Sequence, residues 1–220
     1  RDIGSHLTIA EAHGISAIIS DNCDYSLLTA SIVASKLGLP FVSVDSALLS
    51  NDKFRQRCAC AHAGIRQPIF EEVRTLEDAV SASERIEYPI VLKPVDSRGT
   101  IGVTIVENLD ELQIAYYEAI SNSPGVRLIC EKFIEGELVT VDGFCFSNGH
   151  RSLTVASRRY AEGKRPVTKH ISSPSAHSAE IRQLLLETHN GVGRALNDDC
   201  GQAHGEYILT PSGEIYLVEC

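Results

Sequence analysis

The chain has 220 residues, and its 20 lysines and arginines against 29 aspartates and glutamates give a net charge of −9. A chain of this length can bury a sizeable core without disulfides or a structural metal. The acidic balance excludes a general polyanion binder, because affinity for nucleic acid comes mainly from neutralised phosphates. Any phosphate site must therefore be local.

Membrane and disulfide signals are also missing from the sequence. No apolar run approaches the roughly 20 residues that a membrane span needs, and no charged and then apolar leader opens the chain. The seven cysteines form an odd set without a CxxC pair or a zinc-finger histidine spacing. We therefore expect a soluble cytoplasmic protein with reduced thiols. Because the chain opens on Arg1, contains no methionine and stops at Cys220 after a strand-like run, we expect further sequence beyond both ends.

The first 46 residues alternate helix-like and strand-like segments. Helical patterns cover residues 7–13 and 25–37, and short apolar runs cover residues 17–20 and 41–44. This alternation is typical of a parallel α/β sheet. We therefore expect residues 1–46 to be the tail of a Rossmann-like domain.

A compact α+β unit is predicted next. Asn51 is a candidate N-cap for a helix that ends at Gly64, Thr75 begins a capping-box-like sequence, and Asn108 begins a further helix. The predicted helices and strands cover residues 51–63, 69–73, 75–86, 90–93 and 103–106, with a helix from residue 108.

The rest of the chain predicts three strands, a basic loop, a long helix and a closing hairpin. The helix is amphipathic, with an apolar face between residues 181 and 196. A Pro-Ser-Gly turn at residues 211–213 separates the two hairpin strands. The predicted strands cover residues 127–133, 138–146, 152–157, 205–209 and 214–219, and the basic loop covers residues 158–169.

The most informative segment is the end of the strand at Lys93 and the turn that follows it. Burying an unpaired ammonium group is costly unless an anion meets it. The turn from Ser97 to Gly102 contains two glycines, two hydroxyl side chains and Arg98, so its backbone N–H groups can fold over phosphate oxygens. Taken alone, the segment is equally compatible with an ordinary turn.

Acidic residues mark two later segments. Residues 130–137 run from an apolar strand into glutamates around Gly136, which alone is compatible with a solvated strand end. In the closing hairpin, antiparallel pairing can bring Glu206 and Glu219 side by side, and adjacent carboxylates repel unless a cation lies between them. Such oxygen ligands suit Mg²⁺. Each glutamate alone favours an exposed strand position, but the pair after a phosphate-type turn favours a metal site.

The order of these motifs resembles the ATP-grasp family, whose members include biotin carboxylase, carbamoyl phosphate synthetase and D-alanine ligase. The resemblance covers residues 51–220. It implies an α+β ATP-grasp fold of two α+β subdomains, preceded by the tail of an α/β Rossmann-like pre-ATP-grasp domain. The implied domains are a partial Rossmann-like domain at 1–46, a small lid subdomain with a linker helix at 47–133, and a large subdomain at 134–220, which we expect to be truncated at its C-terminal end.

The resemblance also implies a nucleotide site for ATP and Mg²⁺ or Mn²⁺. Lys53 and Lys93 match the family's phosphate-contacting lysines. The other implied groups are the mobile phosphate loop of Ser97, Arg98, Gly99, Thr100 and Gly102, the adenine hinge of Glu131, Lys132, Phe133 and Ile134, and the metal ligands Glu206 and Glu219.

The chain departs from the family pattern in two places. A ribose-binding glutamate often lies two residues past the hinge glycine, where this chain has Leu138, and Glu137 comes one position early. The asparagine and arginine that usually follow the second metal glutamate would fall beyond Cys220. We keep Glu137 as the candidate nucleotide ligand.

Basic residues between 158 and 170 match a region that contacts the γ-phosphate or the acid substrate in family members. Arginine suits bidentate carboxylate binding, although a charged loop is as often simply solvated. We take Arg159 and Lys169, together with Lys93, as the candidate catalytic residues. His204 lies two residues before Glu206, and we expect it to pack or to support the metal site rather than to bind the metal.

The implied function is an ATP-dependent carboxylate-amine ligase that forms a C–N bond through an acyl phosphate and releases ADP and phosphate. Its partners would be small-molecule carboxylate and amine substrates, with no nucleic acid and no membrane, and a homodimer is compatible with the resemblance. A second reading is activation of bicarbonate, as in carbamoyl phosphate synthetase or biotin carboxylase. A third, of another class, is an ATP-binding module without turnover. The sequence leaves the acid and the amine open.

Overall fold

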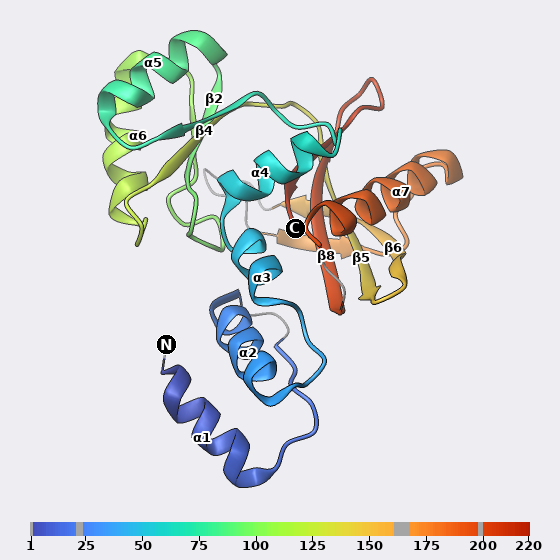
Figure 1. Cartoon of the computed structure of the whole chain (residues 1–220). Coiled ribbons are helices and arrows are strands. Elements are labelled where there is room, and N and C mark those ends of the chain that lie inside the picture. The colour runs from blue at the N-terminus through green and yellow to red at the C-terminus, as the bar shows by residue number, and fades with distance from the viewer. Residues whose placement is uncertain (1, 21–23, 161–167, 198–199) are drawn as a thin grey trace.

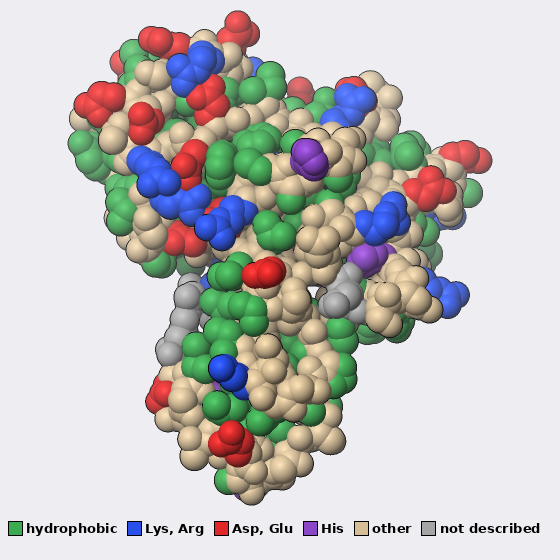
Figure 2. Space-filling view, viewed as in Figure 1, with side chains coloured by type: hydrophobic (Ala, Val, Ile, Leu, Met, Phe, Trp, Pro, Cys, Tyr) green, Lys and Arg blue, Asp and Glu red, His purple; other side chains and the backbone are tan. Residues whose placement is uncertain are grey.

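The computed structural model describes residues 2–20, 24–160, 168–197 and 200–220. Three helices, α1 (Ile3–His13), α2 (Asp24–Leu37) and α3 (Val44–Ser50), come first. Helices α1 and α2 lie apart from the two sheets that follow (Figure 1), whereas Leu49 of α3 packs against the core of the large sheet. None of the described helices is long and apolar enough to cross a membrane. In Figure 2 acidic and basic side chains are interspersed on the small-sheet region at the upper left, without one large basic patch.

The predicted strands at residues 17–20 and 41–44 are wrong for the described residues. Neither segment is a strand, and Val44 instead begins α3, where the Ser43 side chain accepts a hydrogen bond from the Ser46 N–H. A strand forms only when its backbone groups pair with a neighbouring strand. The described residues offer these two apolar segments no such partner, so the α/β sheet of the predicted Rossmann-like tail is not present among them.

The small sheet has the antiparallel order β1-β4-β2-β3. The Thr75 side chain and Asp78 form a complete capping box at the start of α5, and Asn108 caps α6, as predicted. The elements are β1 (Phe70–Val73), α5 (Leu76–Ile86), β2 (Ile90–Pro94), β3 (Thr104–Val106), α6 (Leu109–Ser121) and β4 (Leu128–Lys132).

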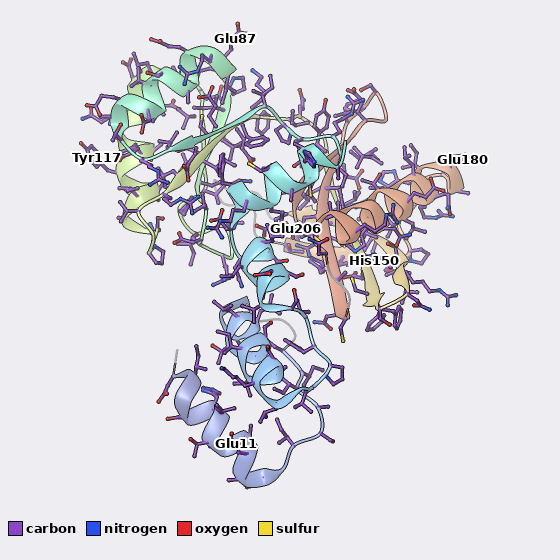
Figure 3. The ribbon with its side chains drawn as sticks, viewed as in Figure 1. Glu11, Glu87, Tyr117, His150, Glu180 and Glu206 are labelled. Atoms are coloured by element: carbon purple, nitrogen blue, oxygen red, sulfur yellow. The ribbon has the colours of Figure 1, made fainter. Side chains whose placement is uncertain are left out.

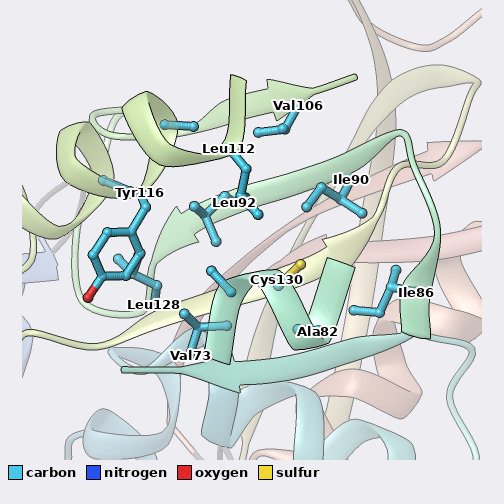
Figure 4. Close-up of a cluster of buried hydrophobic side chains, with 13 residues drawn as sticks. Val73, Ala82, Ile86, Ile90, Leu92, Val106, Leu112, Tyr116, Leu128 and Cys130 are labelled. Carbon is cyan, nitrogen blue, oxygen red and sulfur yellow. The ribbon is translucent and has the colours of Figure 1, made fainter. Parts of the chain in front are cut away.

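Alternation along β2 and β4 divides the small sheet into a core face and a polar face. Leu92 pairs with Cys130, and both lie in the core beneath α5 and α6 (Figure 4). Successive strand residues point to opposite faces. Lys93 and Glu131, each one residue further along, therefore share the face that looks away from the helices.

The large sheet has the antiparallel order β7-β6-β5-β8-β9, with α7 packed on one face. Two of its strands extend into the segment that was expected to be a basic loop. Strand β6 includes Arg158 and Arg159, and β7 includes Lys169. The elements are β5 (Glu137–Phe146), β6 (Gly149–Tyr160), β7 (Thr168–Ser172), α7 (Ala179–Ala195), β8 (Gly201–Leu209) and β9 (Ile215–Glu219). The expected loop residues 161–167 lie outside the described residues.

Helix α4 (Lys53–His62) lies between the two sheet regions (Figure 1). Its N-cap is Asp52 rather than the predicted Asn51, which instead ends α3, because a side-chain oxygen of Asp52 accepts the Arg55 N–H. Cys60 belongs to the core of the large sheet, so α4 packs with that sheet although the predicted boundary at residue 47 places it with the lid. The predicted domain boundaries stay predictions.

The structure places no disulfide among the described cysteines. They are Cys58, Cys60, Cys130, Cys145, Cys200 and Cys220, while Cys23 lies outside the described residues. Cys58 is exposed and Cys60 is buried, as expected for helical residues two apart.

Candidate nucleotide and metal site

A cavity of about 170 Å³ between the two sheets collects most of the predicted site residues. Its apolar lining includes Pro68, Val91, Ile208, Tyr216 and Leu217. The predicted residues that line it are Lys53, Lys93, Ser97, Arg98, Gly99, Thr100, Glu131, Lys132, Phe133, Ile134, Glu206 and Glu219. A lining that combines apolar and charged side chains suits a ligand that has a flat base and a polyanionic tail.

A buried group of three charges forms the small-sheet side of the cavity. The Lys93 Nζ lies 2.8 Å from Glu131 Oε2, and the Arg57 Nε donates to Glu131 Oε1 at 2.8 Å. Burial disfavours the charged form of Glu131, but the charges of Arg57 and Lys93 outweigh it and lower the pKa of Glu131 to about 2. Burial lowers the pKa of Lys93, and Glu131 opposes that effect.

Lys53 connects α4 to both other parts of the site. Its Nζ lies 3.1 Å from Glu219 Oε2 and donates to the Ser97 carbonyl oxygen at 2.6 Å. Its backbone N–H donates to Val95 at the end of β2. The first turn of α4 is therefore fixed against the phosphate-type loop and the last strand together.

The loop from Ser97 to Gly102 is held by internal hydrogen bonds. The Ser97 hydroxyl donates to the Ile101 carbonyl at 2.5 Å. Gly102 has a φ of +74°, and a Cβ there would lie 2.9 Å from Pro94 Cγ, so a larger residue would be strained twice. Gly102 is not among the cavity-lining residues. The structure thus gives Gly102 a packing role at the base of the loop, and its predicted phosphate contact stays a prediction.

The predicted adenine hinge leaves β4 at the rim of the cavity. The backbone N–H groups of Lys132 and Phe133 donate to Ile69 and Pro89, which occupies both donors. The Glu131 side chain belongs to the buried charge group. Gly136 is required after the hinge, because a Cβ there would lie 2.5 Å from the Leu209 carbonyl oxygen.

Glu206 and Glu219 lie opposite each other on β8 and β9, as the hairpin predicted. Glu206 lies near the centre of the molecule in the view of Figure 3. Its Oε1 accepts from Arg158 at 2.7 Å, and its side chain is 19% exposed against 40% for Glu219. The described residues contain no group of three histidine, cysteine or acidic side chains placed to hold a metal. Two carboxylates nevertheless fit Mg²⁺, which takes one or two of them and completes its shell with water and phosphate oxygens.

His204 supports this carboxylate pair. Its Nδ1 lies 2.6 Å from Asp142 Oδ1, and its Nε2 lies 3.9 Å from Glu206 Oε1. The hydrogen bond with Asp142 and the nearby Glu206 carboxylate raise the pKa of His204 to about 9. The expected supporting role of His204 stays a prediction.

Besides Gly102, three predicted residues do not line the cavity. Strand alternation places Arg159 on the opposite face of β6 from Arg158, the residue that contacts Glu206. Lys169 is the extra residue of the bulge where β7 pairs with Arg159 and Tyr160, and its side chain is exposed. Glu137 is exposed and lies 3.4 Å from His177 Nε2.

Sequence reasoning selected Arg159 in place of its neighbour Arg158 and did not select Arg57. Extending the predicted strand at residues 152–157 by three residues and counting alternate positions from Thr154 would have selected Arg158. Ile208 also lines the cavity. It lies two residues after Glu206 on the same strand face, so counting alternate positions from Glu206 would have selected it. Nothing in the sequence signals that Arg57 reaches Glu131, because 74 residues separate them.

A second cavity, of about 530 Å³, adjoins the carboxylate pair through Arg158. It lies between the N-terminal segment and the face of the large sheet that α7 leaves open. Its lining mixes apolar and polar side chains: Ser20, Leu27, Val42, Ser50, Asn51, Asp142, Gly143, Phe144, Leu153, Thr154, Arg158, Cys200, Gln202, Ala203, His204 and Cys220.

The solved structures similar to this chain share its fold. The L-amino acid ligase from Bacillus licheniformis superposes with a TM-score of 0.84 at 21% identity, over 99% of this chain and 51% of that protein. A biotin carboxylase–β,γ-ATP complex from Campylobacter jejuni gives the same TM-score and identity over the same shares.

The sequence comparisons agree with the fold. The chain is 26% identical to the alanine–anticapsin ligase of Bacillus amyloliquefaciens, over 96% of this chain and 49% of that protein. It is 25% identical to a D-alanine–D-alanine ligase of Geobacter sulfurreducens, over 83% of this chain and 58% of that protein. The chain thus spans about half the length of its curated relatives. The family model for the ATP-grasp domain matches residues 86–220, more than half of the chain, and the chain therefore belongs to the ATP-grasp family.

Proposed function

We propose that this chain holds Mg-ATP in the cavity between the two sheets and belongs to an ATP-dependent carboxylate-amine ligase. One observation carries the proposal: two lysines, Lys53 and Lys93, and the paired carboxylates Glu206 and Glu219 line one cavity. Cations and metal-type ligands in the same cavity match a triphosphate with its magnesium ion.

The chain's own residues have distinct roles in this reaction. Lys93 and Lys53 bind the triphosphate and stabilise the charge that develops as the γ-phosphoryl group moves to a substrate carboxylate. The loop from Ser97 to Gly102 covers the phosphates and excludes water from the acyl phosphate until the amine attacks. Glu206 and Glu219 would hold Mg²⁺, which supplies further positive charge to the phosphates when bound.

The second cavity favours an organic acid over bicarbonate. Bicarbonate needs only a small anion pocket, whereas a cavity of about 530 Å³ lies beside Glu206. Arg158 lines it and offers a guanidinium group for a carboxylate. Phe144 and Leu153 provide apolar surface. Relatives named as alanine and L-amino acid ligases favour substrates of amino-acid size.

We further propose that the protein works in the cytoplasm and that a homodimer is its assembly.

Positional isotope labelling tests the reaction in the full-length protein. If a carboxylate accepts the phosphoryl group, oxygen-18 from that carboxylate must appear in released phosphate, and ADP must be the nucleotide product. Release of AMP and pyrophosphate would overturn the acyl-phosphate route. Mg-ATP should also raise the melting temperature, and Lys93→Ala should remove most of that rise. An equal rise in the variant would remove Lys93 from the phosphate site.

A further inference from the structure

Arg57 is a buried cation between the two sheets and makes several hydrogen bonds. Its side chain is 1% exposed, and it donates four hydrogen bonds from the middle of α4. Two go to the Glu131 carboxylate at 2.8 and 3.3 Å, one goes to the Val218 carbonyl oxygen at 2.7 Å, and one goes to Gln67 at 3.2 Å. Such fixed, shared donors leave Arg57 little freedom to bind a ligand directly.

These contacts place α4 on both walls of the nucleotide cavity. Glu131 lies on β4 of the small sheet, and Val218 precedes Glu219 on β9 of the large sheet. The neighbouring Gln56 donates to the Cys220 carbonyl oxygen at 2.5 Å and accepts the Cys220 N–H at 3.0 Å. The side chains of α4 thereby hold the backbone on both sides of Glu219.

The charges of the buried group do not cancel. Glu131 alone would neutralise Lys93, and a neutral pair would attract a polyanion weakly. Arg57 occupies the same carboxylate with two N–H groups, so the three side chains together carry one excess positive charge beside the cavity. In a poorly solvated site this charge acts strongly on a nearby phosphate.

We propose that Arg57 is a positioning residue that neutralises Glu131 and so leaves the charge of Lys93 available to the nucleotide phosphates. The contacts through Val218 keep this charge in register with the strand of Glu219. The proposal rests on the nucleotide site proposed above, but it concerns a residue that does not touch the nucleotide.

Mg-ATP titration by calorimetry on folded full-length variants tests the proposal. Arg57→Gln should weaken Mg-ATP binding about tenfold, since Glu131 then neutralises Lys93. Arg57→Lys loses the two-pronged contact with Glu131 but keeps the charge that neutralises it, and should therefore weaken binding less than Arg57→Gln, by about threefold. The double variant Arg57→Gln/Glu131→Gln removes both charges and should recover most of the affinity, which a merely structural role of Arg57 would not produce. Arg55→Gln, on the exposed side of the same helix, is the matched control and should bind like the wild type.

The outcomes separate this inference from the proposed function. Failure of the wild type to bind Mg-ATP would overturn both. A wild type that binds, with an Arg57→Gln variant of equal affinity or a double variant no better than the single one, would overturn only the role of Arg57. If Arg57→Gln does not fold, a loss above tenfold in Arg57→Lys would show that side-chain shape rather than charge matters, and would also overturn it.

Discussion

The two walls of the nucleotide cavity carry charge in different ways. On the small sheet, Glu131 is buried and contacts both Arg57 and Lys93. On the large sheet, Glu206 and Glu219 are partly exposed. Glu219 contacts Lys53, and Glu206 contacts Arg158 and lies 3.9 Å from the His204 ring.

The difference separates a fixed part of the site from an exchangeable one. Removing one member of a buried ion pair leaves an unpaired charge out of water, which is strongly destabilising. Partly exposed ion pairs contribute little to stability, because water screens them and can replace either partner. We expect the Glu131 group to hold its geometry through the reaction, while the carboxylates of the large sheet can exchange their protein cations for a metal ion.

The largest effect is expected when the buried charge group on the small sheet is disrupted. Glu131→Ala should lower the free energy of unfolding by about 3–5 kcal/mol, because Arg57 and Lys93 lose their common partner. Urea unfolding monitored by circular dichroism measures this change. Glu135→Ala is the matched control, since Glu135 is exposed four residues later, and should change stability by less than about 0.5 kcal/mol. Equal values for both variants would contradict the distinction.

A pH titration extends the comparison to the buried face of the large sheet. The Nδ1 of His189, on α7, lies 2.8 Å from the Tyr207 hydroxyl oxygen at that face, and burial lowers the pKa of His189 from 6.5 to about 4. At pH values between 4 and 6.5 the unfolded state binds more protons than the folded state. The contribution of neutral His189 to the free energy of unfolding is therefore fully present above about pH 6.5 and falls as the pH drops toward 4. The loss should reach about 3 kcal/mol.

The variant His189→Gln isolates this contribution, because glutamine can keep a hydrogen bond to Tyr207 but does not titrate. Urea unfolding at several pH values should show a shallower loss of stability below pH 6.5 in the variant than in the wild type. Parallel curves for the two proteins would mean that His189 is not held neutral in the fold.

Removing an exchangeable carboxylate tests the other wall. Glu219→Gln should reduce turnover about 100-fold, because charge stabilisation during phosphoryl transfer is typically worth that much, while stability changes by less than about 1 kcal/mol. Steady-state ADP release and urea unfolding on full-length protein give the two values. Glu214→Gln on the same hairpin is the control. A turnover near that of the wild type would remove Glu219 from the metal site.

The smallest expected effect compares two neighbouring arginines. Arg158→Ala should lower kcat/KM for the acid substrate about tenfold through loss of a charge-assisted contact. Arg159→Ala should change it much less, because Arg159 points to the other face of β6. The reverse order would restore Arg159, the residue favoured by the sequence, as the catalytic one.

Local patterns explain why much of the fold and site could be predicted. Thr75 and Asn108 begin helices because their side chains accept the first free N–H groups, a contact that spans three residues. The opposition of Glu206 and Glu219 follows from a short hairpin turn between their strands. Local patterns did not decide which arginine faces the cavity, because Arg158 and Arg159 differ by a single step along a strand, and the strand extends further than its apolar residues indicate.

The sequence alone determined the order of the motifs, whose resemblance indicated the family and many of the residues that line the cavity. It also predicted most helices and strands, because alternation, caps and glycine positions act over a few residues. The tertiary structure decided which charges meet. Arg57 and Glu131, separated by 74 positions, became partners only when α4 packed between two sheets. The apolar segments at residues 17–20 and 41–44 did not become strands, because pairing depends on a neighbour that no local pattern supplies.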